Sequence, residues 1–489
     1  MTPTEQVERH EAVVSDLKGR VRGPLLLPGT PAYDEARSVW NAMIDRRPAL
    51  ILRCLGVTDV IAGVNAARDR GLPLSIKGGG HNIAGLAVCE GGLMLDMSLM
   101  RGVWVDPGAR VARAQAGCLL GDIDAETQVH GLAAVLGFVS ATGCAGLTLG
   151  GGFGYLTRRF GWTSDNLASI DLVTADGKVL RASEREHSDL FWGLRGGGGN
   201  FGVATSFEYK LHDVGPTILG GAIAWRGEDA ASVLEMYRSL VANAPRELTC
   251  VAALRLAPPA PWIAKEVHGK PIVALFVCHS GAPAQAEAVI ASIKSFGTPV
   301  GDIVQRRSYV SQQMLLDATQ PKGRRYYWKS EYLRGIGTDL FARAIAHATR
   351  LASPHSAILI FPIDGALNAV PEGHSAVGNR DASAVLNIAS AWEHARDDAM
   401  NIEWARNTWA DLRQFSTGGT YINFLTEDEG NERTLAAYRS NYERLVRLKA
   451  EWDPANLFRT NKNIDPAGDR GDTLAPSGLR ELDHAATQP

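Results

Sequence analysis

The stretch KGGGHN, residues 77–82, decides how the rest of this sequence is interpreted. Three consecutive glycines let the backbone adopt dihedral angles that other residues avoid, and they let a large molecule approach the chain closely. A nucleophilic imidazole, that of His81, follows at once. The apolar run LPLSI at 72–76 predicts a short strand that leads straight into this loop.

Two more glycine-rich stretches follow, GGGFG at 150–154 and GGGGNFG at 196–202. The second of these matches GxGxxG, but a Rossmann site needs a strand before the motif and a helix after it. Here the helix-like HSDLFWGLRG precedes the motif and the strand-like VATSFEYKL follows it. We therefore exclude a Rossmann NAD site, and the absence of GxxxxGK[ST] excludes a P-loop.

Glycine loops also suit a pyrophosphate, because successive free N–H groups can form an anion-binding nest. Any one of these loops can equally be a simple turn that needs positive φ angles. Three of them in one half of the chain favour a bound dinucleotide.

Composition sets the broad class. The 489 residues are 45% hydrophobic and 21% charged, with a formal net charge of −3, as in a soluble globular protein of about two to four domains. Near neutrality gives no reason to expect nucleic acid or a membrane as partner. The N-terminus has no secretory pattern, and no apolar run approaches a membrane span, so we expect a cytoplasmic location.

The six cysteines form no CxxC pair and no Cys/His grouping with zinc spacing, so no metal site is predicted. Cysteines in a long chain of this kind are usually small buried hydrophobic residues. We apply that interpretation to five of them and single out Cys144 below.

Local patterns predict a mixed α+β fold. Residues 169–183 are typical of a hairpin with an Asp-Gly turn, and 202–211 alternate as a strand does. Beyond about residue 215, strand-like runs alternate with helical ones, and 431–450 predict one long helix.

Three motifs together carry a family resemblance: KGGGHN, ATGCAGLTLGGGFGYLTRRFG at 141–161, and GGGGNFGVAT at 196–205. With YINF at 421–424 and NLFRTNKNI at 456–464, the chain resembles the berberine bridge enzyme-like flavoproteins of the vanillyl-alcohol oxidase superfamily. The resemblance covers almost the whole chain, with the motifs in the expected order.

The resemblance implies a fold in two parts, a PCMH-type FAD-binding domain and a substrate domain with a large antiparallel sheet covered by helices. The implied divisions are 1–215 for the first part of the FAD domain, 216–430 for the substrate domain, 431–466 for a segment that returns to the FAD domain, and 467–489 for a flexible tail.

The resemblance also implies FAD bound through two covalent bonds, from His81 to the 8α-methyl carbon and from Cys144 to C6 of the flavin. Substitution of the flavin ring at these two positions should raise its reduction potential. Two anchors should also keep FAD in place in a wide, open cleft, which would suit a bulky substrate. Further FAD contacts carried over by position are Lys77, Gly78, Gly79, Gly80, Asn82, Gly143, Gly146, Thr148, Gly150, Gly151, Gly199, Asn200, Val203, Asn461 and Asn463.

Oxidation of an alcohol by a flavin needs a base for the hydroxyl proton. The family's Tyr-x-Asn motif implies Tyr421 for this role, with Asn423 on the same strand face. Many relatives carry a second tyrosine after the Asn, where this chain has Phe424. A phenol with pKa near 10 needs a neighbouring cation to act as a base, and GRRYYWKSEYL at 323–333 places Tyr327 and Lys329 on one strand face.

We therefore expect an FAD-dependent oxidase that takes a hydride from a hydroxylated substrate, an oligosaccharide or a bulky secondary metabolite, and reduces O2 to H2O2. Two alternatives stay open. One keeps the flavin but forms a C–C or C–N bond, or uses another electron acceptor. The other is a non-catalytic binding protein on a degenerate flavin scaffold.

Overall fold

The computed structural model describes residues 12–468, so the tail predicted at 467–489 lies almost wholly outside the described residues. Two small sheets build the N-terminal half. The first has strand order β1-β2-β4-β3, and two of its three strand pairings are parallel. The second, β5-β6-β10-β8-β9, is antiparallel throughout. Their strands are β1 Leu25–Leu26, β2 Leu50–Arg53, β3 Leu74–Lys77, β4 Leu93–Asp96, β5 Val103–Asp106, β6 Val111–Gln115, β8 Leu167–Val173, β9 Val179–Ser183 and β10 Val203–Lys210.

Sequence and structure agree closely in this half. The predicted hairpin is β8 and β9, and the predicted strand at 202–211 is β10. A helix, α7, precedes the third glycine loop and β10 follows it, which confirms the order that excluded a Rossmann site. The helices of this half are α2 Pro31–Arg37, α3 Val57–Asp69, α4 Leu120–Gln128, α5 Cys144–Leu149, α6 Thr157–Phe160 and α7 Ser188–Leu194, and the short strands β7 Leu132–Ala133 and β11 His212–Asp213 pair with each other.

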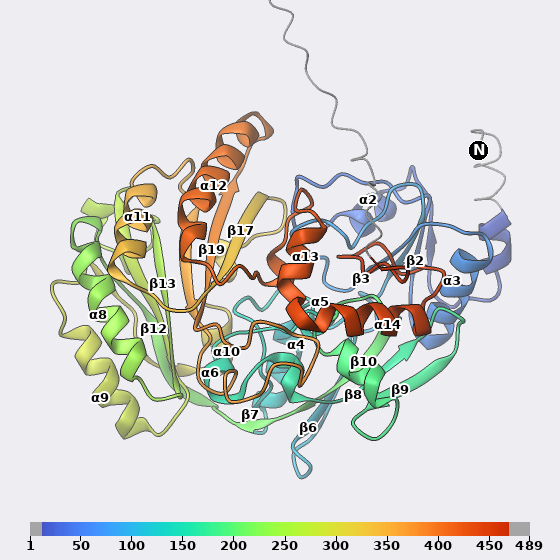
Figure 1. The fold of residues 1–489 in the computed structure, drawn as a ribbon, viewed down its shortest axis with the longest axis horizontal. Coiled ribbons are helices and arrows are strands. Elements are labelled where there is room, and N and C mark those ends of the chain that lie inside the picture. The colour runs from blue at the N-terminus through green and yellow to red at the C-terminus, as the bar shows by residue number, and fades with distance from the viewer. Residues whose placement is uncertain (1–11, 469–489) are drawn as a thin grey trace, which may run out of the picture.

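An eight-stranded antiparallel sheet dominates the second half, as expected (Figure 1). Its order is β15-β12-β14-β13-β18-β19-β17, with β16 also paired to β12. The strands are β12 Thr217–Arg226, β13 Leu248–Leu256, β14 Pro271–His279, β15 Gly301–Asp302, β16 Gln305–Ser308, β17 Arg325–Leu333, β18 Ala357–Pro362 and β19 Ala384–Trp392.

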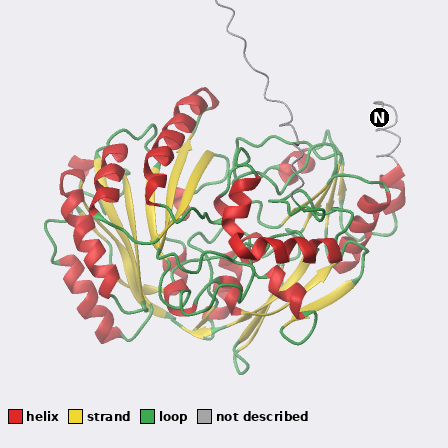
Figure 2. Ribbon diagram, viewed as in Figure 1, coloured by secondary structure: helices red, strands yellow, loops and turns green. Residues whose placement is uncertain are grey.

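Helices cover one face of this sheet, and the N-terminal half covers the other (Figure 2). The covering helices are α8 Ala230–Asn243, α9 Pro283–Lys294, α11 Thr338–Ala348 and α12 Asp398–Leu412, while α10 Tyr309–Gln313 packs on α4. Strand β13 shows that both faces of the sheet are buried. Cys250 and Ala252 join the core under the helices, whereas Val251 and Ala253 join a second core with Phe153 of the N-terminal half. A sheet covered on both faces favours such continuous apolar strands.

The C-terminal segment does not form the single long helix predicted at 431–450. It forms α13 Asn431–Tyr438 and α14 Tyr442–Trp452, separated by one 3₁₀ turn. Arg439 has φ 50°, in the left-handed region, and this residue breaks the helix. Helix α14 then packs on α7, and Leu445 and Leu448 enter the core of the N-terminal half.

The fold is thus the mixed helix-and-sheet architecture with a large antiparallel sheet that the sequence predicted. Among residues 12–468, none of the helices combines the length and apolar character of a membrane-spanning segment.

Candidate functional site

A large cavity lies between the two halves of the molecule, on the face of the big sheet away from the helices. With its mouth it encloses about 1920 Å³ of space. The glycine loop after β3, the start of α5 and the third glycine loop form one side, and Trp328, Phe361 and Asn387 of the big sheet form the other. Thirteen predicted residues line it: Gly78, Gly79, Gly80, His81, Asn82, Gly143, Gly146, Gly199, Asn200, Val203, Tyr421, Asn423 and Asn461.

The first two glycine motifs come together because glycine permits backbone to touch backbone. A Cβ added to Gly79 would lie 2.5 Å from Gly143 N and Cα, so a side chain here would push the two loops apart. Gly80 has φ 66° and turns the chain so that His81 reaches the cavity wall. The sequence of this loop therefore builds one continuous glycine-lined wall.

His81 is held as a neutral imidazole with an unused nitrogen. Its ring stacks on Trp40, with centroids 4.2 Å apart and planes 17° apart. Burial lowers the pKa of His81 to about 4. Its Nε2 is buried, and in the described part of the chain it has no hydrogen-bond partner. An uncharged nitrogen with a free lone pair at a cavity wall can act as a nucleophile or hold a ligand.

Cys144, the second expected anchor, lies directly behind the cavity wall, between two residues that line it. All six cysteines fall within residues 12–468, all are buried, and none lines the cavity. The Cys144 thiol points into the core, where Sγ lies 3.6 Å from the Gln115 carbonyl oxygen and burial raises its pKa. Its neighbours Gly143 and Ala145 face the cavity instead. Since α5 begins at Cys144, its side chain is directed by the helix toward the core rather than the wall.

Tyr421 and Asn423 do contact each other, but through a 3₁₀ turn rather than a strand. Helix Ile422–Phe424 brings Asn423 Nδ2 within 2.9 Å of Tyr421 Oη. The Gly152 N–H also donates to Tyr421 Oη, at 3.0 Å. Burial nevertheless raises the pKa of Tyr421 above its ordinary value. The phenol is therefore protonated, and it is suited to donate its hydrogen into the cavity rather than to accept a proton.

Tyr327 and Lys329 share one face of β17, as predicted, but that face is turned away from the cavity. The residue of β17 that lines the cavity is Trp328, between them. Tyr327 belongs to the core under the helices, and Lys329 Nζ lies 5.6 Å from the Trp409 ring of α12. Alternation along a strand determines which side chains share a face of the sheet, but not which of the two faces lines the cavity.

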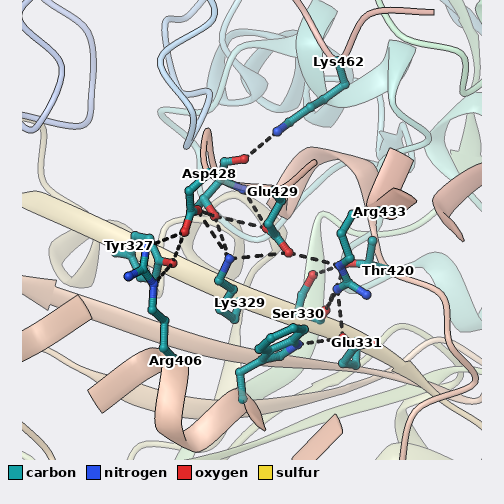
Figure 3. A network of polar contacts seen from close by, with 12 residues as sticks. Tyr327, Lys329, Ser330, Glu331, Arg406, Thr420, Asp428, Glu429, Arg433 and Lys462 are labelled. Carbon is teal, nitrogen blue, oxygen red and sulfur yellow. Dashed lines mark hydrogen bonds and ion pairs between the residues drawn. The ribbon is translucent and has the colours of Figure 1, made fainter. Parts of the chain in front are cut away.

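These two residues belong instead to a polar network between β17, α12 and the 426–433 segment (Figure 3). Lys329 Nζ lies 3.4 Å from Asp428 Oδ1 and 3.7 Å from Glu429 Oε1. Tyr327 Oη donates to Asp428, at 2.6 Å. Arg433 pairs with Glu429, at 3.1 Å, and closes the network. The side chains of Lys329 and Glu429 are 5% and 4% exposed, so each charge depends on this pairing for its stability.

Lys462 connects this network to the cavity, and the sequence reasoning missed it. It lines the cavity, and its Nζ donates to the Thr426 carbonyl oxygen (Figure 3). Burial, countered by Glu429 and Asp428, lowers the pKa of Lys462 to about 8. The sequence did hold a signal for Lys462. It lies in the NLFRTNKNI motif, where it is a cation between Asn461 and Asn463, two residues already assigned to FAD.

The remaining predicted residues lie behind the wall. Lys77 Nζ donates to the Ala36 carbonyl oxygen and lies 3.7 Å from Asp96, and Thr148 Oγ1 lies 2.8 Å from Tyr209 Oη. Gly150 contacts Asn423, since a Cβ there would lie 2.2 Å from Asn423 Oδ1. Gly151 and Asn463 also do not line the cavity.

Aromatic and apolar side chains form most of the wall that sequence reasoning missed. They are Phe138, Phe153, Leu316, Trp328, Leu359, Phe361 and Phe424. Phe361 contacts Phe138 and Phe153, and Trp328 contacts Phe424, with ring centroids 5.1 to 5.5 Å apart. Two polar atoms stand among them, Trp328 Nε1 and Asn387 Oδ1, both buried and without a hydrogen-bond partner in the structure as described. Asn387 had a readable signal, because it is the single amide in the otherwise apolar strand AVLNIASAW.

The residues present fit FAD. A Cβ on Gly146 would meet no atom within 4 Å, so this glycine faces open space. The glycine wall, the unpartnered nitrogen of His81 and the unpartnered Oδ1 of Asn461 offer the close approach and hydrogen-bonding groups a dinucleotide needs. Between residues 12 and 468, no three His, Cys, Asp or Glu side chains gather as a metal site.

Two family models match the chain, an FAD-binding domain over residues 48–183 and "berberine and berberine like" over 420–465. (R)-6-hydroxynicotine oxidase of Paenarthrobacter nicotinovorans is 33% identical over 92% of this chain and 98% of its own. Xylooligosaccharide oxidase of Thermothelomyces thermophilus is 26% identical over 93% and 95%. The crystal structure of 6-hydroxy-D-nicotine oxidase from Arthrobacter nicotinovorans matches with a TM-score of 0.82 and 30% identity, over 91% of this chain and 98% of that one.

Proposed function

Because the chain belongs to the berberine bridge enzyme-like FAD-linked oxidoreductases, we propose that it oxidises a largely aromatic, hydroxylated substrate and uses O2 as electron acceptor. The product of the second half-reaction is then H2O2. Both named relatives are called oxidases, one of a hydroxynicotine and one of a xylooligosaccharide, which supports the reaction type.

FAD, when bound, accepts the hydride equivalent and passes the electrons on. The protein's part is to hold it between the glycine wall and the big sheet, with Gly78–Asn82 and Gly143–Gly146 against one side. His81 is proposed as a single covalent anchor. Its ring is fixed by Trp40, its nitrogen is free, and its low pKa keeps it uncharged and nucleophilic at neutral pH. A second bond, from Cys144, would require its thiol, which lies 3.6 Å from the Gln115 carbonyl oxygen, to turn toward the cavity.

The wall opposite the glycine loops favours an aromatic substrate over an oligosaccharide. Phe361, Trp328 and Phe424 offer ring faces and edges, whereas a sugar would require many hydroxyl partners. Trp328 Nε1 can donate one hydrogen bond and Asn387 Oδ1 can accept one. One donor and one acceptor in an apolar surround fix the orientation of a flat, hydroxylated molecule.

Proton transfer falls to Lys462 in this proposal, not to Tyr421. With a pKa of about 8, Lys462 is partly neutral near physiological pH and can accept the substrate's hydroxyl proton. Tyr421, whose pKa is raised, keeps its proton and donates a hydrogen bond while Asn423 and Gly152 fix its oxygen. In this proposal Lys462 is the base, so no second tyrosine is needed at the position that Phe424 occupies.

The observation that carries this proposal is the buried Nε2 of His81, which has no hydrogen-bond partner among the described residues, at the end of a glycine wall beside an aromatic pocket. We would supply aromatic alcohols, hydroxylated N-heterocycles and xylo-oligosaccharides to the air-equilibrated protein and measure peroxide. We expect peroxide with an aromatic class only. Bleaching of the flavin without oxygen, followed by slow reoxidation in air, would instead indicate a dehydrogenase. Turnover of oligosaccharides alone would contradict the aromatic assignment.

A further inference from the structure

A second cavity opens on the same face of the big sheet, over β12, β13 and β14. With its mouth it encloses about 990 Å³ of space. Strand residues Ala222, Ala274 and Phe276 form its floor, and the 258–263 and 303–319 segments form its walls. It shares no lining residue with the larger cavity. The 315–320 segment separates them, since Leu315 lines one and Leu316 the other.

One charged side chain stands on this floor without an acidic partner. Strand β13 alternates Val251, Ala253 and Arg255 onto the inner face, so the arginine ends an otherwise apolar row. Its one hydrogen bond in the described part of the chain runs from Nε to the Leu256 carbonyl oxygen, at 3.2 Å, and no carboxylate of residues 12–468 pairs with it. Arg255 is partly buried, and its two terminal nitrogens are not among the buried atoms that lack a partner, so water reaches them. An anion that replaced this water would gain a charge-assisted pair in an otherwise apolar cavity.

The neighbouring charges do not neutralise Arg255. Arg324 and His355 also line the cavity, and both bind the same atom, Glu393 Oε1, at 2.9 and 3.2 Å. One carboxylate thus serves two basic groups. Burial, and after it the nearby charge of Arg324, lower the pKa of Arg255.

The rest of the lining is apolar and includes Pro258, Trp262, Ile263, Phe276, Ile303 and Leu315. We propose that this cavity is a binding site, separate from the flavin cavity, for a small organic acid whose carboxylate pairs with Arg255 and whose aromatic or aliphatic body packs against Trp262 and Phe276. Arginine binds carboxylates through two parallel hydrogen bonds, and both terminal nitrogens of Arg255 are free to make them. An apolar body explains the walls, which a bare inorganic anion would leave unused.

The test is calorimetric titration of the FAD-loaded protein with 3-phenylpropionate, with its neutral amide and with inorganic phosphate as matched probes. We expect one equivalent of the acid to bind saturably, and the amide and phosphate to bind about 10- to 100-fold more weakly. Arg255→Met keeps the side-chain length but removes the charge, and we expect a similar loss of affinity for the acid. Arg306→Met, on the exposed ion pair with Glu287, is the control and should bind as wild type does.

Ala274→Leu is a second test of the site, because it adds volume to the floor of the cavity and leaves every charged residue in place. Because Ala274 is 1% exposed in a packed core, the added volume should lower the melting temperature. It should also abolish binding of the acid, while an unchanged flavin spectrum shows that the variant is folded. Equal binding of acid and amide, equal binding of phosphate, or no saturable binding of the acid would each overturn the proposal. So would an acid that perturbs the flavin spectrum and still binds both Arg255→Met and Ala274→Leu, since it would then occupy the larger cavity.

Discussion

Replacement of Lys329 by methionine distinguishes a structural lysine from a catalytic one. Its side chain is 5% exposed, and its Nζ lies 3.4 to 3.7 Å from Asp428 and Glu429. The Lys329→Met variant keeps the apolar stem that packs near Tyr327 and Trp409 but removes the ammonium. If Lys329 acts only in the network of Figure 3, the variant loses stability and keeps its chemistry.

The size of the loss follows from the contacts. Loss of one partner of a buried ion pair costs about 3 to 5 kcal/mol of unfolding free energy. We expect the lower end, about 3 kcal/mol, because the distances are long and the two carboxylates keep Arg406 and Arg433 as partners. With about 2.1 cal/mol/K of unfolding entropy per residue, this lowers the melting temperature by roughly 3 °C if the whole chain unfolds together, or roughly 7 °C if the 216–430 region unfolds alone.

The assay is thermal unfolding of the FAD-loaded protein, followed by flavin fluorescence, together with the rate of flavin bleaching by substrate. Lys178→Met is the control, because Lys178 and Asp176 form an exposed pair, and it should shift the melting temperature by less than about 1 °C. We expect a bleaching rate per folded molecule within about twofold of wild type, since no transition-state contact is lost. An unchanged melting temperature with a rate at least about 100-fold lower would refute this reasoning and return Lys329 to the catalytic group.

Three other predictions concern the cofactor and the proton. His81→Ala should release FAD on denaturation. Cys144→Ala should retain it, so that the intact mass of the denatured variant still includes one FAD. Gly146→Ala should leave the cofactor-free protein as stable as wild type, because its Cβ meets nothing, yet lower the FAD content of the purified protein. In wild type the bleaching rate should rise as pH increases through about 8, where Lys462 loses its proton. Lys462→Met should bleach about 100-fold more slowly, and its rate should no longer rise through this pH range.

Each of these has a contrary result. Retention of FAD after denaturation of His81→Ala, or its release from Cys144→Ala, would restore the cysteine anchor. A full complement of FAD in Gly146→Ala would place the cofactor elsewhere in the cavity. The sign of the pH effect is fixed, because a lysine is cationic below its pKa and can accept a proton only above it. A rate that falls through pH 8 would make Lys462 a required cation instead.

The sequence by itself determined the class of fold and the cofactor. Three glycine loops, in an order that no Rossmann unit has, predicted a dinucleotide site of another kind, and KGGGHN placed His81 at its edge. With the family resemblance of the five motifs, the sequence predicted the mixed fold and FAD correctly. Glycine patterns and strand alternation are local, and local backbone geometry follows from local sequence. The predicted hairpin and the strand at 202–211 are correct for the same reason.

Only the tertiary structure decided which side of each element faces the cavity. Alternation grouped Tyr327 with Lys329, but the packing of α12 against β17 turned that group away and presented Trp328. The family resemblance assigned Cys144 to the flavin, and only the packing shows its thiol 3.6 Å from the Gln115 carbonyl oxygen, behind the wall. Lys462 and Asn387 reach the cavity from segments far apart in the chain. Such contacts depend on how separate elements pack, and a pattern of residues within one element carries no record of its neighbours across the fold.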